Sequence, residues 1–395
     1  MRLAAIFLVL LVFLLGGCDR NGYDEEWTIN YISGGSHIAG EPLPQGYDYA
    51  FYLPQYMETI YASRDLDSQL AEYYDIILNE TGGFVDIAPM IADGSYYWLL
   101  NLLWAEQLGF PHVEGVQSWE YTGNTSGFNI KYIYRFTAKE VSEMNRAAEL
   151  AADKIMAGIT PDMSDYDKLK YFHDYLIINC VSDIDDPLAD TIYGALVEKK
   201  ALCEGYAKAF SYLCNRAGIE NMIVYGWTEI YHMWNMVKLN GNWYHVDVTW
   251  GNPGFLDYPE AVLYQYFMVT DAEIGATHTI RREFIDPPRA NSNIENYFLR
   301  ENRRRYVPGG GDFLGVAGAA LSDAIEKKES SASIRFERDE DYAAAVNMLK
   351  QNNRQDGGVW QIIDEISETL NVNFTVNYTD YYADKKVLVF LIDYS

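Results

Sequence analysis

Apolar and polar positions in the first half of the chain follow two different rhythms. Apolar residues at every second position between 128 and 136 are typical of a strand with one buried face. From 141 to 155 the apolar positions recur at helical spacing, and they do so again from 165 to about 179. Ser164 and Asp167 precede the second of these helices at the spacing of a capping box, so we expect the helix to begin there.

The end of the chain has the pattern of a small, separate unit of mixed helix and strand. A strand is predicted around Ile334 and Phe336. Two helices and two further strands are predicted after it, the helices over 341–350 and 359–370 and the strands over 372–378 and 386–394. Just before this unit, residues 300–332 contain Arg303-Arg304-Arg305 and three consecutive glycines, which predict a linker with its arginines in a solvated turn.

Asn240-Gly241 lies between two runs of alternating residues and is the strongest short-range signal of a β-hairpin. A two-residue turn fixes the register, with three pairs expected along it: Leu239 opposite Asn242, Trp234 opposite Asp247, and His232 opposite Thr249. On this register His232 and Asp247 are diagonal neighbours on one sheet face, roughly 7–8 Å apart at the backbone. Trp234 and His245 project to the same face. The register therefore predicts a hydrogen bond between His232 and Asp247.

Cys203 stands at the first turn of another predicted helix, which Gly218 ends. The apolar face of that helix is formed by Tyr206, Ala207, Phe210, Leu213, Cys214 and Ala217. Backbone N–H groups and the helix dipole stabilise an anion at a helix start, so the thiolate of Cys203 is favoured. Cys214 lies in the middle of the apolar face, which is typical of an unreactive packing thiol. One helix thus carries both a candidate nucleophile and a structural cysteine.

A cysteine, a histidine and a third group that orients the histidine are the parts of an activated nucleophile. Cys203, His232 and Asp247 are the candidates for these three roles. The same three residue types also bind zinc, which leaves metal ligation as a weaker hypothesis. Because a thiol at a helix start favours nucleophilic chemistry, we predict no metal site. His173, on the apolar face of its helix, is predicted to be structural, whereas Trp234 is a candidate for the substrate site.

The N-terminal residues indicate a compartment. Met1-Arg2 supplies a positive start, and the apolar run from Leu3 to Leu15 is too short to span a bilayer comfortably. With the small residues that follow, this pattern is typical of a secretory signal. The segment Leu15-Gly16-Gly17-Cys18 resembles a bacterial lipobox, which implies cleavage before Cys18 and a lipid on its sulfur. We expect an extracytoplasmic protein held on a bacterial membrane by lipid alone; an ordinary signal or a single anchor helix is the alternative.

Composition narrows the function classes further. The chain of 395 residues is 49% hydrophobic and 22% charged, as in globular proteins, and is long enough for two or three domains. Its net charge of −27 argues against nucleic acid or an anionic membrane surface as a partner, because both require a positive face. With Cys18 assigned to lipid, three cysteines remain, so at least one thiol is unpaired within the monomer. This excludes a disulfide scaffold.

Three segments together resemble the bacterial transglutaminase-like superfamily: Gly194-Ala195-Leu196 with Leu202-Cys203-Glu204-Gly205-Tyr206-Ala207, His232-Met233-Trp234-Asn235, and Trp243-Tyr244-His245-Val246-Asp247-Val248-Thr249-Trp250. The resemblance implies a papain-like fold, with Cys203 as nucleophile, His232 as general base and acid, and Asp247 as the residue that orients His232. Members of the family often carry an aromatic residue before the nucleophile that helps to hold the oxyanion. No such residue stands near Ser182, and Tyr193 is the substitute that we consider.

The fold class that follows is α+β. A papain-like, transglutaminase-like core, with the nucleophile helix packed on an antiparallel sheet, is flanked by smaller α/β regions. The expected organisation is a signal peptide over 1–17, a tether over 18–55, an N-terminal α/β region over 56–160 that begins with two helical stretches between about 56 and 108, the transglutaminase-like core over 161–299, a linker over 300–332, and a small C-terminal α/β domain over 333–395.

The function expected from these residues is acyl transfer from an amide through a thioester on Cys203. Water as acceptor makes the protein a protease or amidase, and a lysine amine makes it a transglutaminase. Peptides or proteins, cell-wall peptides among them, are the expected substrates, and this chemistry requires no metal or organic cofactor. The rival hypothesis is a catalytically silent binding or assembly module on the same fold.

Overall fold

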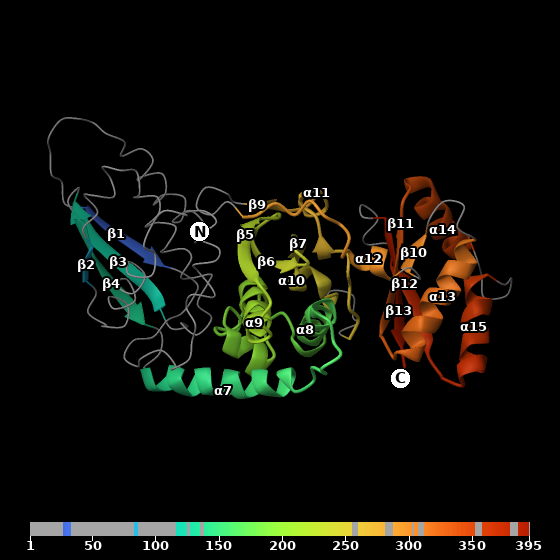
Figure 1. The fold of residues 1–395 in the computed structure, drawn as a ribbon, viewed down its shortest axis with the longest axis horizontal. Helices are drawn as coiled ribbons and strands as arrows, with labels where there is room; N and C mark the ends of the chain where they lie inside the picture. Colours follow the sequence, from blue (N-terminus) through green and yellow to red (C-terminus); the bar gives the residue numbers. More distant parts are fainter. Residues whose placement is uncertain are drawn as a thin grey trace. The chain divides into compact units, whose positions relative to one another are not determined.

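The computed structural model describes residues 27–32, 83–85, 116–124, 127–134, 138–254, 260–280, 287–301, 304–306, 312–351, 358–379 and 386–394 (Figure 1). The chain divides into two compact units. The first comprises Met1–Ile155, Pro187–Glu198 and Arg281–Pro287, and the second comprises Met156–Asp186, Lys199–Ile280 and Pro288–Ser395. None of the described helices combines the length and the apolar character needed to cross a bilayer. The signal sequence and Cys18 lie outside the described residues.

The first unit contains an antiparallel sheet of four strands in the order β1-β3-β4-β2. Its strands are β1 (Trp27–Ile32), β2 (Gly83–Val85), β3 (Val116–Asn124) and β4 (Gly127–Tyr134). The alternation between 128 and 136 therefore predicted β4 correctly, and the helical spacing after it became α7 (Ala138–Met156). The expected tether over 18–55 is wrong at β1, which is paired with β3 along its whole length.

The second unit is built around an antiparallel sheet of five strands in the order β8-β7-β6-β5-β9. The strands are β5 (Asn221–Trp227), β6 (Tyr231–Leu239), β7 (Asn242–Val246), β8 (Phe267–Val269) and β9 (Thr279–Ile280). Helix α9 (Cys203–Arg216) packs on β5 and β6 of this sheet (Figure 1). Helix α8 (Asp165–Asn179) packs against α9. This arrangement of a helix that begins with Cys203 on an antiparallel sheet is the predicted α+β core.

The capping box of α8 forms as predicted. The Ser164 hydroxyl accepts a hydrogen bond from the Asp167 backbone N–H, and the Asp167 carboxylate accepts one from the Ser164 backbone in return. At the other end of the helix, the carbonyl of Cys180 accepts hydrogen bonds from the Tyr206 hydroxyl and the Asn252 side chain, at 3.0 and 3.1 Å. These buried bonds fix the end of α8 against α9.

The hairpin of β6 and β7 has the predicted register as far as β7 extends. Asn240 and Gly241 both have positive φ, as a two-residue turn of this kind requires, and Leu239 pairs with Asn242. The strand ends at Val246, however, so the predicted pairs of Trp234 with Asp247 and of His232 with Thr249 do not form. Instead the chain turns into the short helix α10 (Val248–Gly251), with Asp247 as its N-cap.

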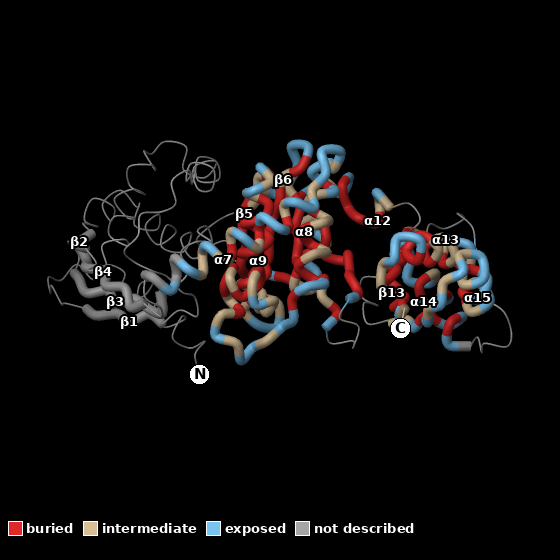
Figure 2. The backbone as a smooth tube through the Cα atoms, turned by 90° about the horizontal axis from the view of Figure 1, so that it is seen from below, coloured by how far each residue is buried: buried red, intermediate tan, exposed pale blue. Residues whose placement is uncertain are grey.

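The C-terminal part of the second unit has its own sheet, in the order β10-β11-β13-β12, with β10 parallel to β11 and the other pairs antiparallel. Its elements are β10 (Arg305–Tyr306), α13 (Phe313–Glu326), β11 (Ser331–Phe336), α14 (Asp339–Gln351), α15 (Val359–Leu370), β12 (Thr375–Thr379) and β13 (Val387–Asp393). Both helices and all three strands predicted from 333 onward are present. Figure 2 shows a set of buried positions that belongs to these elements alone.

The predicted linker over 300–332 is wrong. It holds α13, whose residues Ala317, Ala320 and Leu321 are buried in the C-terminal core. Arg304 does not lie in a solvated turn either: it is 1% exposed and binds the carboxylates of Asp323 and Glu329. Burial opposes the charged form of Arg304, but its neighbours, these two carboxylates among them, keep its pKa above the ordinary value. The arginine is a structural ion-pair partner.

Candidate active site

Cys203 is the first residue of α9, and a short pairing upstream fixes its position. The backbone of Val181 donates to the Lys199 carbonyl at 2.9 Å and accepts from the Ala201 N–H at 3.0 Å. The N-cap residue Leu202 has an extended backbone and no side chain that bonds the helix start. Cys203 therefore lies at an N-terminus whose N–H groups receive no capping bond from that residue, where an anion is stabilised.

The other two described cysteines differ from Cys203 in exposure. Cys180 and Cys214 are buried, whereas Cys203 is partly exposed, and none of the three forms a disulfide. Burial raises the pKa of Cys180 to about 12 and raises that of Cys214 well above its ordinary value. Both buried thiols are thus held in the unreactive, protonated form. Accessibility alone separates the candidate nucleophile from the packing thiols.

His232 and Asp247 are in direct contact, as the hairpin pattern predicted. The Nε2 atom of His232, on β6, lies 2.7 Å from Oδ2 of Asp247, and both side chains are almost fully buried. Because β7 ends one residue earlier, Asp247 reaches His232 from the N-cap of α10 and not from a sheet face. The Cys203 side chain is hydrogen-bonded to His232, and Nδ1 is the ring nitrogen left for it. The three residues form a continuous Cys–His–Asp chain.

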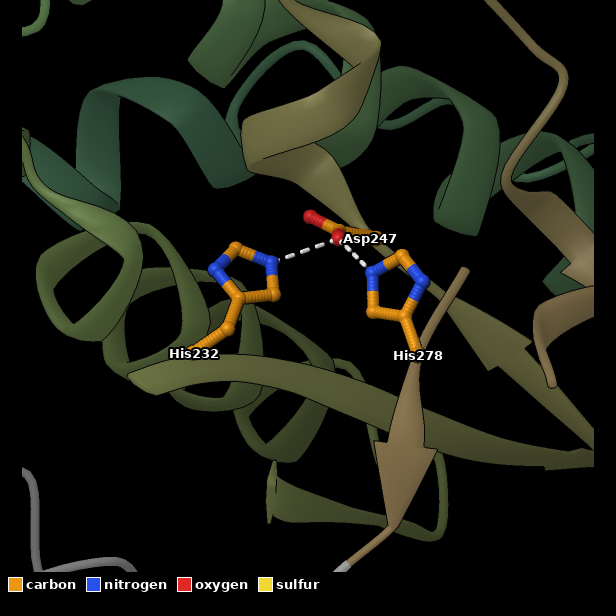
Figure 3. A group of neighbouring side chains, drawn as sticks. All are labelled: His232, Asp247 and His278. Carbon is orange, nitrogen blue, oxygen red and sulfur yellow. Dashed lines mark hydrogen bonds and ion pairs between the residues drawn. The ribbon is translucent and has the colours of Figure 1, made fainter. Parts of the chain in front are cut away.

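The carboxylate of Asp247 is held from three sides. Oδ1 accepts the Trp250 backbone N–H at 3.0 Å, and Oδ2 is shared between Nε2 of His232 and Nε2 of His278, the latter at 3.0 Å (Figure 3). Burial on its own favours the neutral acid, but the charge and hydrogen bond of His232, with a further bond from His278, hold the pKa of Asp247 well below its usual range. The buried carboxylate is therefore an anion.

The protonation of His232 follows from this anion. Burial on its own lowers the pKa of an imidazole, but the charge of Asp247 and its hydrogen bond act in the opposite direction, and Cys203 adds to them. The result is a pKa of His232 raised to about 10. At neutral pH His232 is accordingly an imidazolium, held between the carboxylate of Asp247 on one side and the sulfur of Cys203 on the other.

Trp234 is buried and stacks on His232. It is 1% exposed, its ring stacks on that of His232 at 6.0 Å, and its indole N–H donates to Nδ1 of His245 at 3.0 Å. The indole has a single donor, so Trp234 has none left for an oxyanion, and its role at the substrate site stays a prediction. Since His245 accepts at Nδ1, its proton is on Nε2 and donates to Asp271 at 2.9 Å.

Sequence reasoning missed His278 and Trp250. His278 is 31 residues beyond Asp247, just before β9, and no spacing rule connects the two. The position of β9 depends on Gly226, because a Cβ there would overlap the Thr279 carbonyl oxygen. Trp250 packs against both histidine rings, 6.1 Å from His232 and 4.8 Å from His278. The one signal in the sequence for Trp250 was its position three residues after Asp247, which is the spacing between a helix N-cap and the backbone N–H that it binds.

His173 and Tyr193 are the remaining predicted residues. His173 is fully buried and bonds Asp174 at 3.0 Å, and burial lowers its pKa, as a structural histidine requires. Tyr193 immediately precedes the π-helical turn η1 (Gly194–Glu198) and belongs to the first compact unit, whereas Cys203 belongs to the second. Its role at the oxyanion stays a prediction.

The arrangement suits hydrogen bonding better than metal binding. His232, Asp247 and His278 bring three ligand atoms within 4.8 Å of one another, but the two nitrogens lie 2.7 and 3.0 Å from the same oxygen. Ligands around a tetrahedral zinc at about 2.0–2.1 Å are about 3.3 Å apart. Cys203 and Asp247 also meet opposite nitrogens of His232, so these three do not converge on one ion. The geometry thus disfavours the zinc hypothesis.

Comparison with known proteins agrees with this geometry. Residues 151–248 match the family model described as the transglutaminase-like superfamily. Over 72 residues the chain is 38% identical to kyphoscoliosis peptidase of Homo sapiens and 36% identical to that of Mus musculus. Each match covers 15% of this chain and 11% of the relative, so the chain spans a small part of the curated relatives that it matches.

A solved structure described as a TGase is 16% identical, with a TM-score of 0.25 over 38% of this chain and 46% of that one. The family match covers the helix that begins with Cys203, the strand of His232 and the position of Asp247. Residues 151–248 therefore contain a transglutaminase-like superfamily domain, with the papain-like α+β fold of that superfamily.

Proposed function

We propose that the protein is an extracytoplasmic cysteine-nucleophile enzyme that transfers the acyl group of an amide bond through a thioester on Cys203. The observation that carries this proposal is the chain from the partly exposed Cys203 through the buried His232 to the ionised Asp247, in which His232 is hydrogen-bonded on both sides. A buried anion kept next to a histidine has an energetic cost, and His232, unlike the structural His173, has a thiol on its far side. An activated thiol gives that arrangement a purpose.

The reaction follows from the positions of these groups. The Cys203 thiolate, paired with the His232 imidazolium, attacks the amide carbonyl to give a tetrahedral oxyanion near the start of α9. The imidazolium then gives its proton to the amide nitrogen, so the C–N bond breaks, an amine leaves and a thioester remains. In the second half His232 removes a proton from the acceptor, which attacks the thioester and releases the Cys203 thiolate. Asp247 stabilises the imidazolium in both halves.

Water is the acceptor that we propose first, which makes the protein a protease or amidase. Both curated relatives are named peptidases, although they match over 72 residues only. A lysine amine, as in a transglutaminase, is the alternative acceptor. The lipobox-like segment before Cys18 supports attachment to a bacterial membrane by lipid alone, and that location favours peptide or protein substrates, cell-wall peptides among them. The net charge of −27 supports no role with nucleic acid.

Selective alkylation tests the nucleophile. The purified chain from residue 19 onward is treated with a limited amount of iodoacetamide at pH 7, and each cysteine is quantified by peptide mapping. We expect Cys203 to be modified well before Cys180 and Cys214, and we expect His232→Gln to slow its modification. Equal reactivity of Cys203 and Cys214 in the folded wild type contradicts the proposal.

Trapping of the acyl-enzyme tests the reaction itself. Intact mass spectrometry after incubation with cell-wall peptides is expected to show an adduct on the wild type and none on Cys203→Ala. A dansylated alkylamine added to the same reaction distinguishes the acceptors, because its incorporation into product indicates transglutamination whereas free carboxylate product indicates hydrolysis. Tight peptide binding that is the same in the wild type and in Cys203→Ala, with no adduct, supports the silent binding module instead.

A further inference from the structure

Asp247 serves two histidines with one oxygen. Nε2 of His232 and Nε2 of His278 lie 2.7 and 3.0 Å from Oδ2 (Figure 3). Oδ1 accepts the backbone N–H of Trp250. Asp247 is fully buried and His278 is 3% exposed, so water does not compete with these bonds at the carboxylate. A triad needs one histidine on its carboxylate, and the second therefore calls for an explanation.

The direction of each hydrogen bond is determined by chemistry. An ionised carboxylate is an acceptor, so both histidines donate from Nε2. On its other side, Nδ1 of His278 lies 2.8 Å from the Thr277 hydroxyl, which in turn lies 3.1 Å from the Tyr266 hydroxyl. The Thr277 hydroxyl fixes which side of the His278 ring faces Asp247. His278 thus presents an N–H to Oδ2 in a fixed orientation.

The surroundings of His278 hold its ring in place. The rings of Trp234, Trp250 and Tyr266 contact it, with centroids 5.0, 4.8 and 5.3 Å away. Behind it, Gly226 allows β9 to approach β5. A buried polar ring enclosed in this way has a fixed position, which is the condition for orienting another group.

We propose that His278 is a positioning residue for the acyl transfer: by sharing Oδ2 of Asp247, it holds the carboxylate plane toward His232 and limits how strongly Asp247 binds the imidazolium proton. The inference rests on the proposed function, since it assigns a role within the same site. An Asp247 that served His232 alone would hold that proton more tightly. His232 must give the proton to the leaving amine, so moderate binding favours turnover.

The inference has a measurable consequence for the pH at which His232 loses its proton. The titratable and charged groups that face His232 are Cys203 from α9, Asp247 from the end of β7 and His278 before β9; the pair of His245 and Asp271 lies behind Trp234, and Tyr266 behind Thr277. Without the hydrogen bond from the His278 N–H, the Asp247 carboxylate interacts more strongly with the His232 imidazolium. The imidazolium then persists to higher pH.

Iodoacetate is the probe for this effect, because its carboxylate is attracted to the imidazolium. The Cys203 thiolate displaces iodide and forms a C–S bond, and the rate falls at high pH where His232 loses its proton. The rate of Cys203 modification is measured against pH in the wild type, His278→Asn and His278→Gln. The glutamine amide places an N–H near the position of Nε2, whereas that of asparagine is too short to reach Oδ2. Both variants carry an amide side chain, so a difference between them reports the length of the side chain and not its polarity.

We expect the alkaline limb of the profile of Cys203 modification rate against pH to move up by about half a pH unit or more in His278→Asn. In His278→Gln the limb stays near its wild-type position. His173→Gln, which alters a buried histidine bonded to Asp174, is the control and leaves the limb unchanged while lowering stability. An unmoved or lowered limb in His278→Asn, or an equal shift in both His278 variants, overturns the inference. Should His278→Asn not fold, the inference predicts the same upward shift for Thr277→Val, smaller in size, and an unchanged limb there overturns it.

Failure of the proposed function gives a different result. In that case Cys203 of the wild type shows no preferential alkylation and no limb at all. If the wild type shows a clear alkaline limb and the His278 variants do not move it, Cys203 is still a nucleophile but His278 is not a positioning residue.

Discussion

Two buried histidines of this domain each contact an aspartate, and their protonation is opposite. On β6, His232 bonds Asp247 at 2.7 Å and its pKa is raised; on α8, His173 bonds Asp174 at 3.0 Å and its pKa is lowered. Burial disfavours the charged imidazole in both places. The residue types are the same, so the difference must come from what else each aspartate and each histidine touches.

The neighbours of the two aspartates account for the contrast. Asp174 also binds the Lys170 ammonium at 2.6 Å and the Tyr264 hydroxyl at 2.9 Å, and the lysine charge opposes a second cation on His173. The far nitrogen of His173, Nε2, is buried without a hydrogen-bond partner among the described residues, so a second proton would have no acceptor. His232 by contrast has Cys203 on its far side. The His173–Asp174 pair, with a lysine beside it, is structural, whereas the His232–Asp247 pair, with a thiol beside it, is a candidate catalytic pair.

The largest expected difference in turnover is between two single variants, in which either His232 or His173 is replaced by glutamine. His232→Gln removes the group that moves the proton, so kcat/KM for 4-nitrophenyl acetate falls by about 10²–10⁴-fold. His173→Gln is expected to leave kcat/KM within about twofold and to lower the thermal midpoint. Turnover is measured with the rate of Cys203→Ala subtracted, and circular dichroism verifies folding. Equal losses of turnover in two folded variants would mean that the two pairs do not differ in function.

A smaller effect is expected when the aspartates are changed. Asp247→Asn keeps the shape and an acceptor for His232 but removes the charge that stabilises the imidazolium, so kcat/KM falls by about 10²-fold or more. Asp174→Asn removes a charge of the same size beside His173 and is expected to leave turnover within about threefold. The same ester assay measures both, with urea unfolding as the control for stability. A strong loss in Asp174→Asn shows that α8 contributes to the site.

Local patterns predicted the parts of the site that local physics determines. The capping box of Ser164, the Asn240-Gly241 turn and the helix that begins at Cys203 depend on neighbours within a few residues, and all three are present. The contact between His232 and Asp247 was also correct, although its predicted cause was partly wrong: β7 ends at Val246 and a capping turn supplies the carboxylate. The capping preference of aspartate competed with the strand pattern and prevailed.

Long-range packing accounts for what the sequence did not predict. His278 reaches Asp247 because β9 approaches β5 at Gly226, a contact that no local pattern encodes. The helix α13 was mistaken for part of a linker because the triple arginine and the three consecutive glycines before it are typical of a flexible segment. Gly318 lets Ile362 of α15 approach this helix closely enough that a Cβ would lie 3.1 Å from it. Asp312, which caps this helix, was the local signal present.

The two histidines are expected to affect stability on opposite sides of neutrality. His232 has a raised pKa, so its contribution is complete below the unfolded value of about 6.5 and is lost as pH rises toward about 10. His173 has a lowered pKa, so the unfolded chain takes up its proton first and stability falls as pH drops below about 6.5. The lowered pKa of Asp247 adds a further loss below about pH 4.

Urea midpoints across this pH range measure the effect in the wild type, His232→Gln and His173→Gln. We expect His232→Gln to flatten the decline on the alkaline side and His173→Gln to flatten the decline on the acid side. A reversed assignment of the two sides would contradict the protonation states given to both pairs.

The smallest effect is expected from Lys170→Met, which tests the cause of the contrast directly. Lys170 is one helical turn before Asp174, and its charge lowers the pKa of His173. Methionine keeps the apolar stem of the side chain but removes the ammonium that lies over the Tyr264 ring and beside Asp174. The pKa of His173 is then expected to rise but to stay below its ordinary value, because burial still opposes the charge. An NMR titration of the histidine rings measures this, with His232 and ester turnover unchanged as the internal control. A His173 pKa that does not rise would show that burial alone, and not the lysine, keeps this histidine neutral.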